Sequence, residues 1–121
     1  MKEYLAKWKN KGGKNIMRKI IDEIMYDTDT AEHICGYSTR NEEDPDYKKE
    51  DLYRKKNGEF FLLGRGGENT EYAFKGLGAF EYYCPNFDYK IIPISENIAK
   101  EFVEAIGDAE TYIRLFGEVE E

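Results

Sequence analysis

The sequence contains few of the residues on which enzymes usually depend. Among its 121 residues there is one His, and there are two Cys and one Trp. It has no Gly-Lys-Ser/Thr phosphate loop and no Gly-x-Ser-x-Gly nucleophile motif, and its carboxylates are scattered over polar stretches. Because no combination of nucleophile, base and orienting group is recognisable, we expect a protein without catalytic activity.

Long hydrophobic runs are also missing. No stretch approaches the roughly eighteen apolar residues of a membrane-spanning helix. The basic N-terminus lacks the apolar core of a signal peptide. We therefore expect a cytoplasmic protein with reduced cysteines, and a length of 121 residues predicts a single domain.

Charge is distributed unevenly along the chain. Residues 1–20 contain seven Lys or Arg and one Glu, a net charge of +6, so the net charge of −7 for the whole chain leaves −13 on residues 21–121. An acidic body repels nucleic acid and is attracted to basic grooves on proteins. We therefore expect a protein partner with a basic surface and no direct binding of nucleic acid, unless the acidity serves solubility alone.

The N-terminal part is predicted to be helical. Tyr4, Leu5 and Trp8 fit one side of a short helix within a basic segment of about residues 1–13, which Gly12 and Gly13 end. Ile16, Ile20 and Ile24 recur at helical spacing, which favours a helix that passes into an extended segment near Met25. The dense β-branched residues also fit a strand over residues 20–26.

The middle of the chain predicts strands. Residues 27–30 form a polar turn, residues 31–37 a strand, and residues 38–50 a solvated loop. Residues 52–67 predict a β-hairpin, with Asn57 and Gly58 suited to a type I′ turn. A short helix over residues 71–75 and two short strands within residues 79–94 follow.

Two helices are predicted at the end of the chain. Ser95 and Asp108 are suitable N-cap residues, and Gly107 and Gly117 mark the helix ends. The fold class is therefore α+β, with a small antiparallel sheet around a central hairpin and the C-terminal helices packed on one face.

A zinc site is the sharpest chemical hypothesis. His33 and Cys35 are two residues apart on a predicted strand, where alternate residues share a face, and Cys84 beside a Pro-Asn turn is a possible third ligand. The fourth ligand would be a carboxylate, water or a partner chain, and zinc would serve a structural role. The pattern lacks the paired Cys-x-x-Cys of specific zinc motifs, so buried packing cysteines or a Cys35–Cys84 disulfide are the alternatives.

The densest aromatic region predicts a partner-binding patch. Tyr is enriched at interfaces because it combines a large area with a polar tip. Strand alternation would place Tyr82 and Tyr83 on opposite faces, leaving one of them exposed. With Glu81 and Asp88 nearby, this cluster is predicted to dock on a basic protein surface.

Three stretches also carry a family resemblance. In order they are YDT-x-TA from Tyr26, LYR-x-K-x-G-x-FFL-x-G-x-GG from Leu52, and FGEVEE from Phe116. This layout resembles small acidic proteins encoded in phages and integrative elements of Firmicutes. Some proteins of this kind resemble anti-CRISPR inhibitors of type II effector nucleases. The resemblance implies an inhibitor that binds such a nuclease, and the alternative is an accessory or regulatory protein of a mobile element without a defence target.

Overall fold

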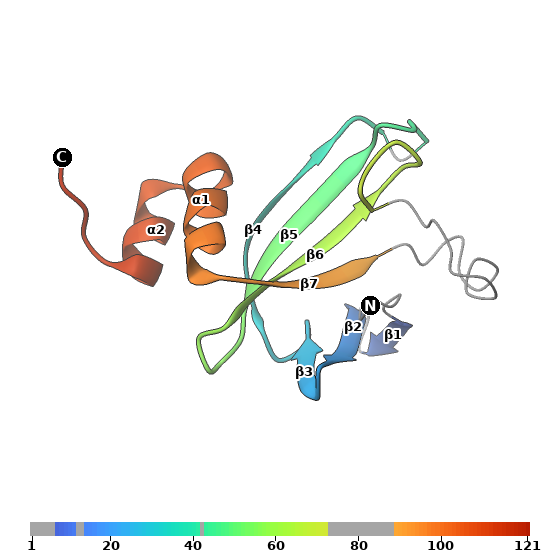
Figure 1. The fold of residues 1–121 in the computed structure, drawn as a ribbon, viewed down its shortest axis with the longest axis horizontal. Helices are drawn as coiled ribbons and strands as arrows, with labels where there is room; N and C mark the ends of the chain where they lie inside the picture. Colours follow the sequence, from blue (N-terminus) through green and yellow to red (C-terminus); the bar gives the residue numbers. More distant parts are fainter. Residues whose placement is uncertain (1–6, 12–13, 42, 73–88) are drawn as a thin grey trace.

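A four-stranded antiparallel sheet lies at the centre of the fold. The computed structural model describes residues 7–11, 14–41, 43–72 and 89–121, and its α+β class confirms the prediction from the sequence. The sheet consists of β4 (Glu32–Thr39), β5 (Lys48–Arg54), β6 (Phe60–Gly66) and β7 (Lys90–Ile94), paired in that order. Figure 1 shows α1 (Glu96–Ile106) and α2 (Ala109–Phe116) at one end of this sheet.

A second, smaller sheet precedes it in the chain. Its strands β1 (Lys7–Lys11), β2 (Lys14–Ile21) and β3 (Ile24–Asp27) form an antiparallel meander. The turn between β2 and β3 has two residues, Asp22 and Glu23, and both have positive φ angles, 51° and 68°. Two such residues give the type I′ turn that matches the twist of the flanking strands.

The central sheet has a hydrophobic core on each face, because successive strand residues point to opposite sides. On one face Phe61 and Leu63 pack with Met17, Ile21, Tyr26 and Ile91, which joins the two sheets. On the other face Leu52, Phe60 and Leu62 pack with Ala99 and Val103 of α1. The apolar run of β6 is therefore continuous because this strand is covered on both faces.

Both C-terminal helices begin and end at the predicted residues. The Ser95 hydroxyl accepts a hydrogen bond from Ile98 N at 3.2 Å, and the Asp108 carboxylate accepts one from Thr111 N at 2.8 Å. Gly107 and Gly117 follow the last helical turns. The N-cap signals were correct because each depends on contacts within one turn.

The central hairpin is confirmed, but its turn type is corrected. Gly58 has a φ of 94°, whereas Asn57 is not among the residues with positive φ. Gly58 N donates to Lys55 O at 2.9 Å, and Lys55 N donates to Glu59 O at 2.7 Å. The connection is thus a five-residue loop with glycine in the left-handed position, in place of the predicted type I′ turn.

The helical prediction for the N-terminal part is wrong where the structure describes it. Lys7–Lys11, within the segment of about residues 1–13 predicted to be helical, is strand β1. Lys14–Ile21 and Ile24–Asp27 are strands in place of one helix. Burial of Met17 and Ile21 against the central sheet favours the β-branched run as a strand, so tertiary packing overrides the helical spacing. Residues 1–6 lie outside the described part.

Candidate functional site

The predicted partner-binding residues lie in a segment whose two flanks are described. Glu81, Tyr82, Tyr83 and Asp88 fall within residues 73–88, outside the described residues, as do most of the predicted helix 71–75 and the first predicted strand of residues 79–94. The chain enters this segment after Tyr72 and leaves it before β7. The geometry of the two flanks is therefore the part of the candidate site that can be built from the structure.

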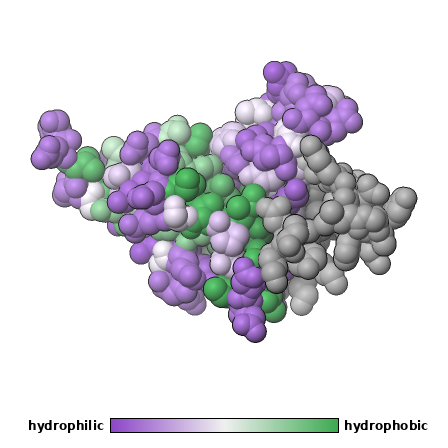
Figure 2. All heavy atoms as spheres, viewed as in Figure 1, coloured by the Kyte–Doolittle hydropathy of each residue, from purple (hydrophilic) through white to green (hydrophobic). Residues whose placement is uncertain are grey.

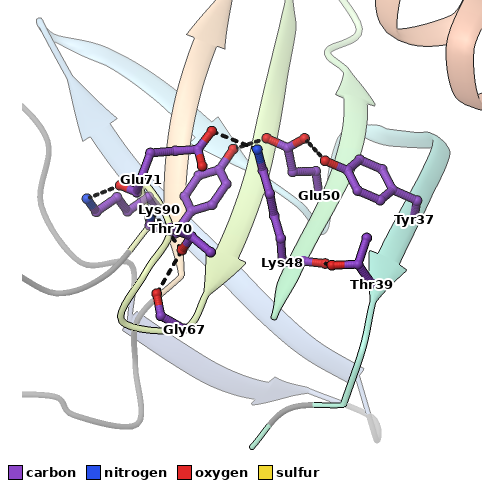
Figure 3. A network of polar contacts seen from close by, with 9 residues as sticks. Tyr37, Thr39, Lys48, Glu50, Gly67, Thr70, Glu71 and Lys90 are labelled. Atoms are coloured by element: carbon purple, nitrogen blue, oxygen red, sulfur yellow. Dashed lines mark hydrogen bonds and ion pairs between the residues drawn. The ribbon is translucent and has the colours of Figure 1, made fainter. Parts of the chain in front are cut away.

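A partly buried network of two tyrosines and one carboxylate holds Tyr72, the residue immediately before this segment. Glu50 of β5 accepts hydrogen bonds from the hydroxyls of Tyr37 and Tyr72 (Figure 3). Burial and the hydrogen bond to Glu50 raise the pKa of both tyrosines above the ordinary value. Both hydroxyls therefore stay protonated and donate to the carboxylate over the physiological pH range.

Gly64 makes room for the Tyr72 ring. Gly64 of β6 is the register partner of Glu50 on β5. A Cβ at residue 64 would collide with the ring, which is almost completely buried. The missing side chain thus lets the ring lie flat on the strand and brings its hydroxyl to the carboxylate.

The two flanks are also joined directly by charged groups. Lys48 Nζ lies 2.7 Å from Glu71 Oε2, and Lys90 Nζ donates to Glu71 O at 3.3 Å. Lys48 lowers the pKa of the Glu71 carboxyl, mainly through this hydrogen bond. Since Glu71 precedes the 73–88 segment and Lys90 follows it, the ends of the segment are held side by side.

Sequence reasoning missed this network. Residues 48 and 50 were predicted to lie in a solvated loop, whereas β5 begins at Lys48. Residues 48–51 are four charged residues in a row, so no apolar–polar alternation marks the start of this strand. Pairing of Glu50 with Tyr72 spans 22 residues and has no local signal.

The zinc prediction placed His33 and Cys35 on the same face of a strand, and this placement is wrong. His33 is paired with Tyr53, but Cys35 is paired with Leu52, because Ile34 is an additional residue in a β-bulge. The neighbours Tyr53 and Leu52 point to opposite faces, and so do His33 and Cys35. Among the described residues no group of three His, Cys, Asp or Glu side chains could hold a metal ion. Cys84 lies outside the described residues, so zinc binding stays an untested prediction.

Each of the two residues has another role in the fold. Cys35 is a free thiol that packs against the core beside α1, and burial raises its pKa. His33 Nε2 lies 2.8 Å from Asp51 Oδ1 on the other face, and Lys49 also contacts Asp51. A protonated thiol on one face and an imidazole that contacts Asp51 on the other do not form a nucleophile and base pair.

The C-terminal helices form a strongly acidic part of the surface. Residues 95–121 contain eight Asp or Glu and two Lys or Arg, a net charge of −6. In the orientation of Figure 1, hydrophilic residues cover much of these helices and the tail, with hydrophobic residues between them (Figure 2). This part of the molecule therefore presents carboxylates together with exposed apolar side chains.

Comparisons with models of known protein families, with curated proteins and with solved structures find no match. Within the described residues, no helix has the length and apolar character needed to cross a membrane.

Proposed function

We propose that the protein is an anti-CRISPR-type inhibitor that binds a type II CRISPR effector nuclease and has no catalytic role. The layout of the three sequence stretches supports the target class by resemblance. The observation that carries the proposal is the segregation of charge, with −13 on residues 21–121 and an acidic pair of helices at one end of the sheet.

Inhibition would follow from competition for cationic side chains. Effector nucleases of this type hold the guide–target duplex in a positively charged channel and read the adjacent motif with Arg. Carboxylates on a folded domain can occupy those cations and exclude DNA, so the bound effector would fail to load or recognise its target. Long-range attraction between opposite charges would also accelerate association.

The contacts that join the two ends of the 73–88 segment support the predicted interface around Glu81, Tyr82, Tyr83 and Asp88. Contacts of Glu71 with Lys48 and Lys90 hold the ends of that segment together. Fixed ends reduce the conformational entropy that the segment would lose on binding a partner. In this proposal the central sheet therefore acts as the rigid base of a binding segment.

The test uses a purified type II effector complex, its guide RNA and a labelled DNA target. We expect the protein to bind the effector, to prevent DNA binding in a mobility-shift assay and to block cleavage. Adding the protein after DNA has bound is the control, and inhibition should then be much weaker. The protein alone should leave DNA and RNA intact.

Two results would contradict the proposal. Effector that binds and cleaves DNA normally with excess protein would exclude inhibition and favour an accessory protein of a mobile element. Turnover of nucleic acid or nucleotide by the protein alone, lost on His33→Ala or Cys35→Ser, would indicate an enzyme.

A further inference from the structure

A groove lies between the C-terminal helices and the chain that follows them. It has a volume of about 430 Å³, within the range of about 300–1,000 Å³ found for ligand pockets. Its apolar lining comes from Val103 and Gly107 of the α1 end, Ala109, Tyr112 and Ile113 of the α2 segment, and Val119 of the tail.

Two of these side chains are unusually exposed for apolar residues. Ile113 is 36% exposed and Val119 is 58% exposed, whereas Val103 at the groove is almost completely buried. The groove thus has a buried apolar base and exposed apolar sides. An apolar side chain from a partner would remove the exposed surface from water, which is favourable.

The charge around the groove has one sign. Glu104 and Asp108 line it, and the hydrogen bonds from Thr111 lower the pKa of the Asp108 carboxyl, which keeps it ionised. Glu118, Glu120 and Glu121 flank Val119 in the tail.

The two cations of residues 95–121 are already engaged with carboxylates. Arg114 lies 3.1 Å from Glu32, and Lys100 lies 3.8 Å from Glu96 and over the Phe116 ring. Neither cation lines the groove. A partner with positive charge would therefore complement the rim.

We propose that this groove binds a basic segment of a partner protein, with one aliphatic or aromatic side chain in the hollow and Lys or Arg against the acidic rim. The inference rests on the proposed function in that the effector nuclease would supply the segment. It deepens that function, because it locates a second contact region outside residues 81–88.

The test uses a short synthetic peptide of Lys and Leu, with NMR detection of amide shifts in the labelled protein. One matched peptide has Ser in place of Leu, and another has Glu in place of Lys. We expect shifts at Val103, Tyr112, Ile113 and Val119 with the first peptide. Affinity should fall about tenfold or more with the Ser peptide, as for loss of an interface anchor, and binding should vanish with the Glu peptide.

Val119→Lys tests the groove, and Ile20→Lys is its matched control. Ile20 is 60% exposed and lies on β2, so both variants place a cation at an exposed aliphatic position. Val119→Lys should weaken peptide binding about tenfold, whereas Ile20→Lys should bind as the native protein does. Equal binding by both variants, or equal affinity for the Leu and Ser peptides, would overturn the proposal.

Two further measurements identify what occupies the groove and test the groove separately from the proposed inhibition. Sedimentation without peptide should show a monomer, and a dimer abolished by Val119→Lys would identify a second copy as the occupant and overturn the proposal. Peptide binding in the groove without effector binding would support the groove and contradict the proposed function. Effector inhibition that is unchanged in Val119→Lys would support the function and overturn the groove.

Discussion

Tyr72 acts through its ring and its hydroxyl, and the two contributions can be measured separately. The ring packs on Gly64, and the hydroxyl donates to Glu50. Both contacts lie next to the segment with the predicted partner-binding residues.

Stability should fall in alkaline solution because three tyrosines stay protonated in the folded protein and lose their protons only when the chain unfolds. Burial raises the pKa of Tyr53 to about 12, and the pKa values of Tyr37 and Tyr72 are also raised. A folded pKa above the unfolded value of about 10 means that this stability is fully present below about pH 10 and is lost as the pH rises further.

Urea denaturation between pH 8 and 11 measures this effect in the native protein and in Tyr72→Phe. At pH 8 the variant should lose about 1.5–3 kcal/mol, the usual contribution of a hydrogen bond to a charged group. Above pH 10 its stability should fall less steeply than that of the native protein. Parallel pH profiles would show that the Tyr72 hydroxyl has the same pKa in the folded and unfolded states, which would contradict the raised pKa.

Gly64→Ala should destabilise the protein because its Cβ would collide with the Tyr72 ring. Overpacking of this kind typically costs about 1–3 kcal/mol. The same substitution in a Tyr72→Ala background should cost much less, since the ring is then absent, and a double-mutant cycle from urea denaturation measures the difference. Equal costs in both backgrounds would contradict the close packing.

At the scale of elements, the turn between β2 and β3 is the clearest point of strain. Asp22 and Glu23 have left-handed backbone conformations that glycine adopts more readily than either residue. Glu23→Gly should therefore raise the free energy of unfolding by about 1 kcal/mol. Glu23→Ala removes the same charge but keeps a Cβ, so it should give no gain. Thermal and urea unfolding of both variants measure these changes, and an equal gain in Glu23→Ala would contradict the role of backbone strain.

The parts of the fold that could be predicted from sequence are those with a signal inside a single turn, and the turn between β2 and β3 has none. Signals confined to one turn, such as Ser95, Asp108 and Gly58, predicted both C-terminal helices and the central hairpin. A type I′ turn without glycine gave no such signal, so the hairpin of β2 and β3 was interpreted as a helix. Ile16, Ile20 and Ile24 satisfy helical spacing, but this part of the chain forms strands because it packs on the central sheet, which is distant in sequence.

The candidate site was less predictable because its contacts are long-range. Glu50 meets Tyr72 across 22 residues, and Arg114 meets Glu32 across 82. A single inserted residue, Ile34, was sufficient to place His33 and Cys35 on opposite faces. Sequence patterns record the period of a strand but give no local sign of a bulge that interrupts it.

At the scale of the whole molecule, the segregated charge predicts salt-dependent association with the effector. Charges separated by more than about 10 Å are largely screened at 0.1 M salt. The association rate should therefore fall steeply between low and physiological salt, with a smaller change in the dissociation rate. Surface plasmon resonance over a salt series measures both rates.

Charge-reversal variants give the matched comparison for this prediction. Glu118→Lys with Glu120→Lys should slow association and leave the melting temperature nearly unchanged, because both residues are exposed in the tail. Glu81→Lys with Asp88→Lys tests the predicted interface in the same assay. Association that is indifferent to salt and to both pairs would show that the acidity serves solubility alone.

The central sheet has hydrophobic cores on both faces, and this determines how the molecule opens. Strands β5 and β6 contribute Leu52, Phe60 and Leu62 to one core and Phe61 and Leu63 to the other. Local opening of the N-terminal sheet or of the helices uncovers one side of these strands and leaves the other covered. Their amide hydrogens should thus exchange with solvent deuterium only when the entire chain unfolds, so their exchange rates report the global stability of the protein.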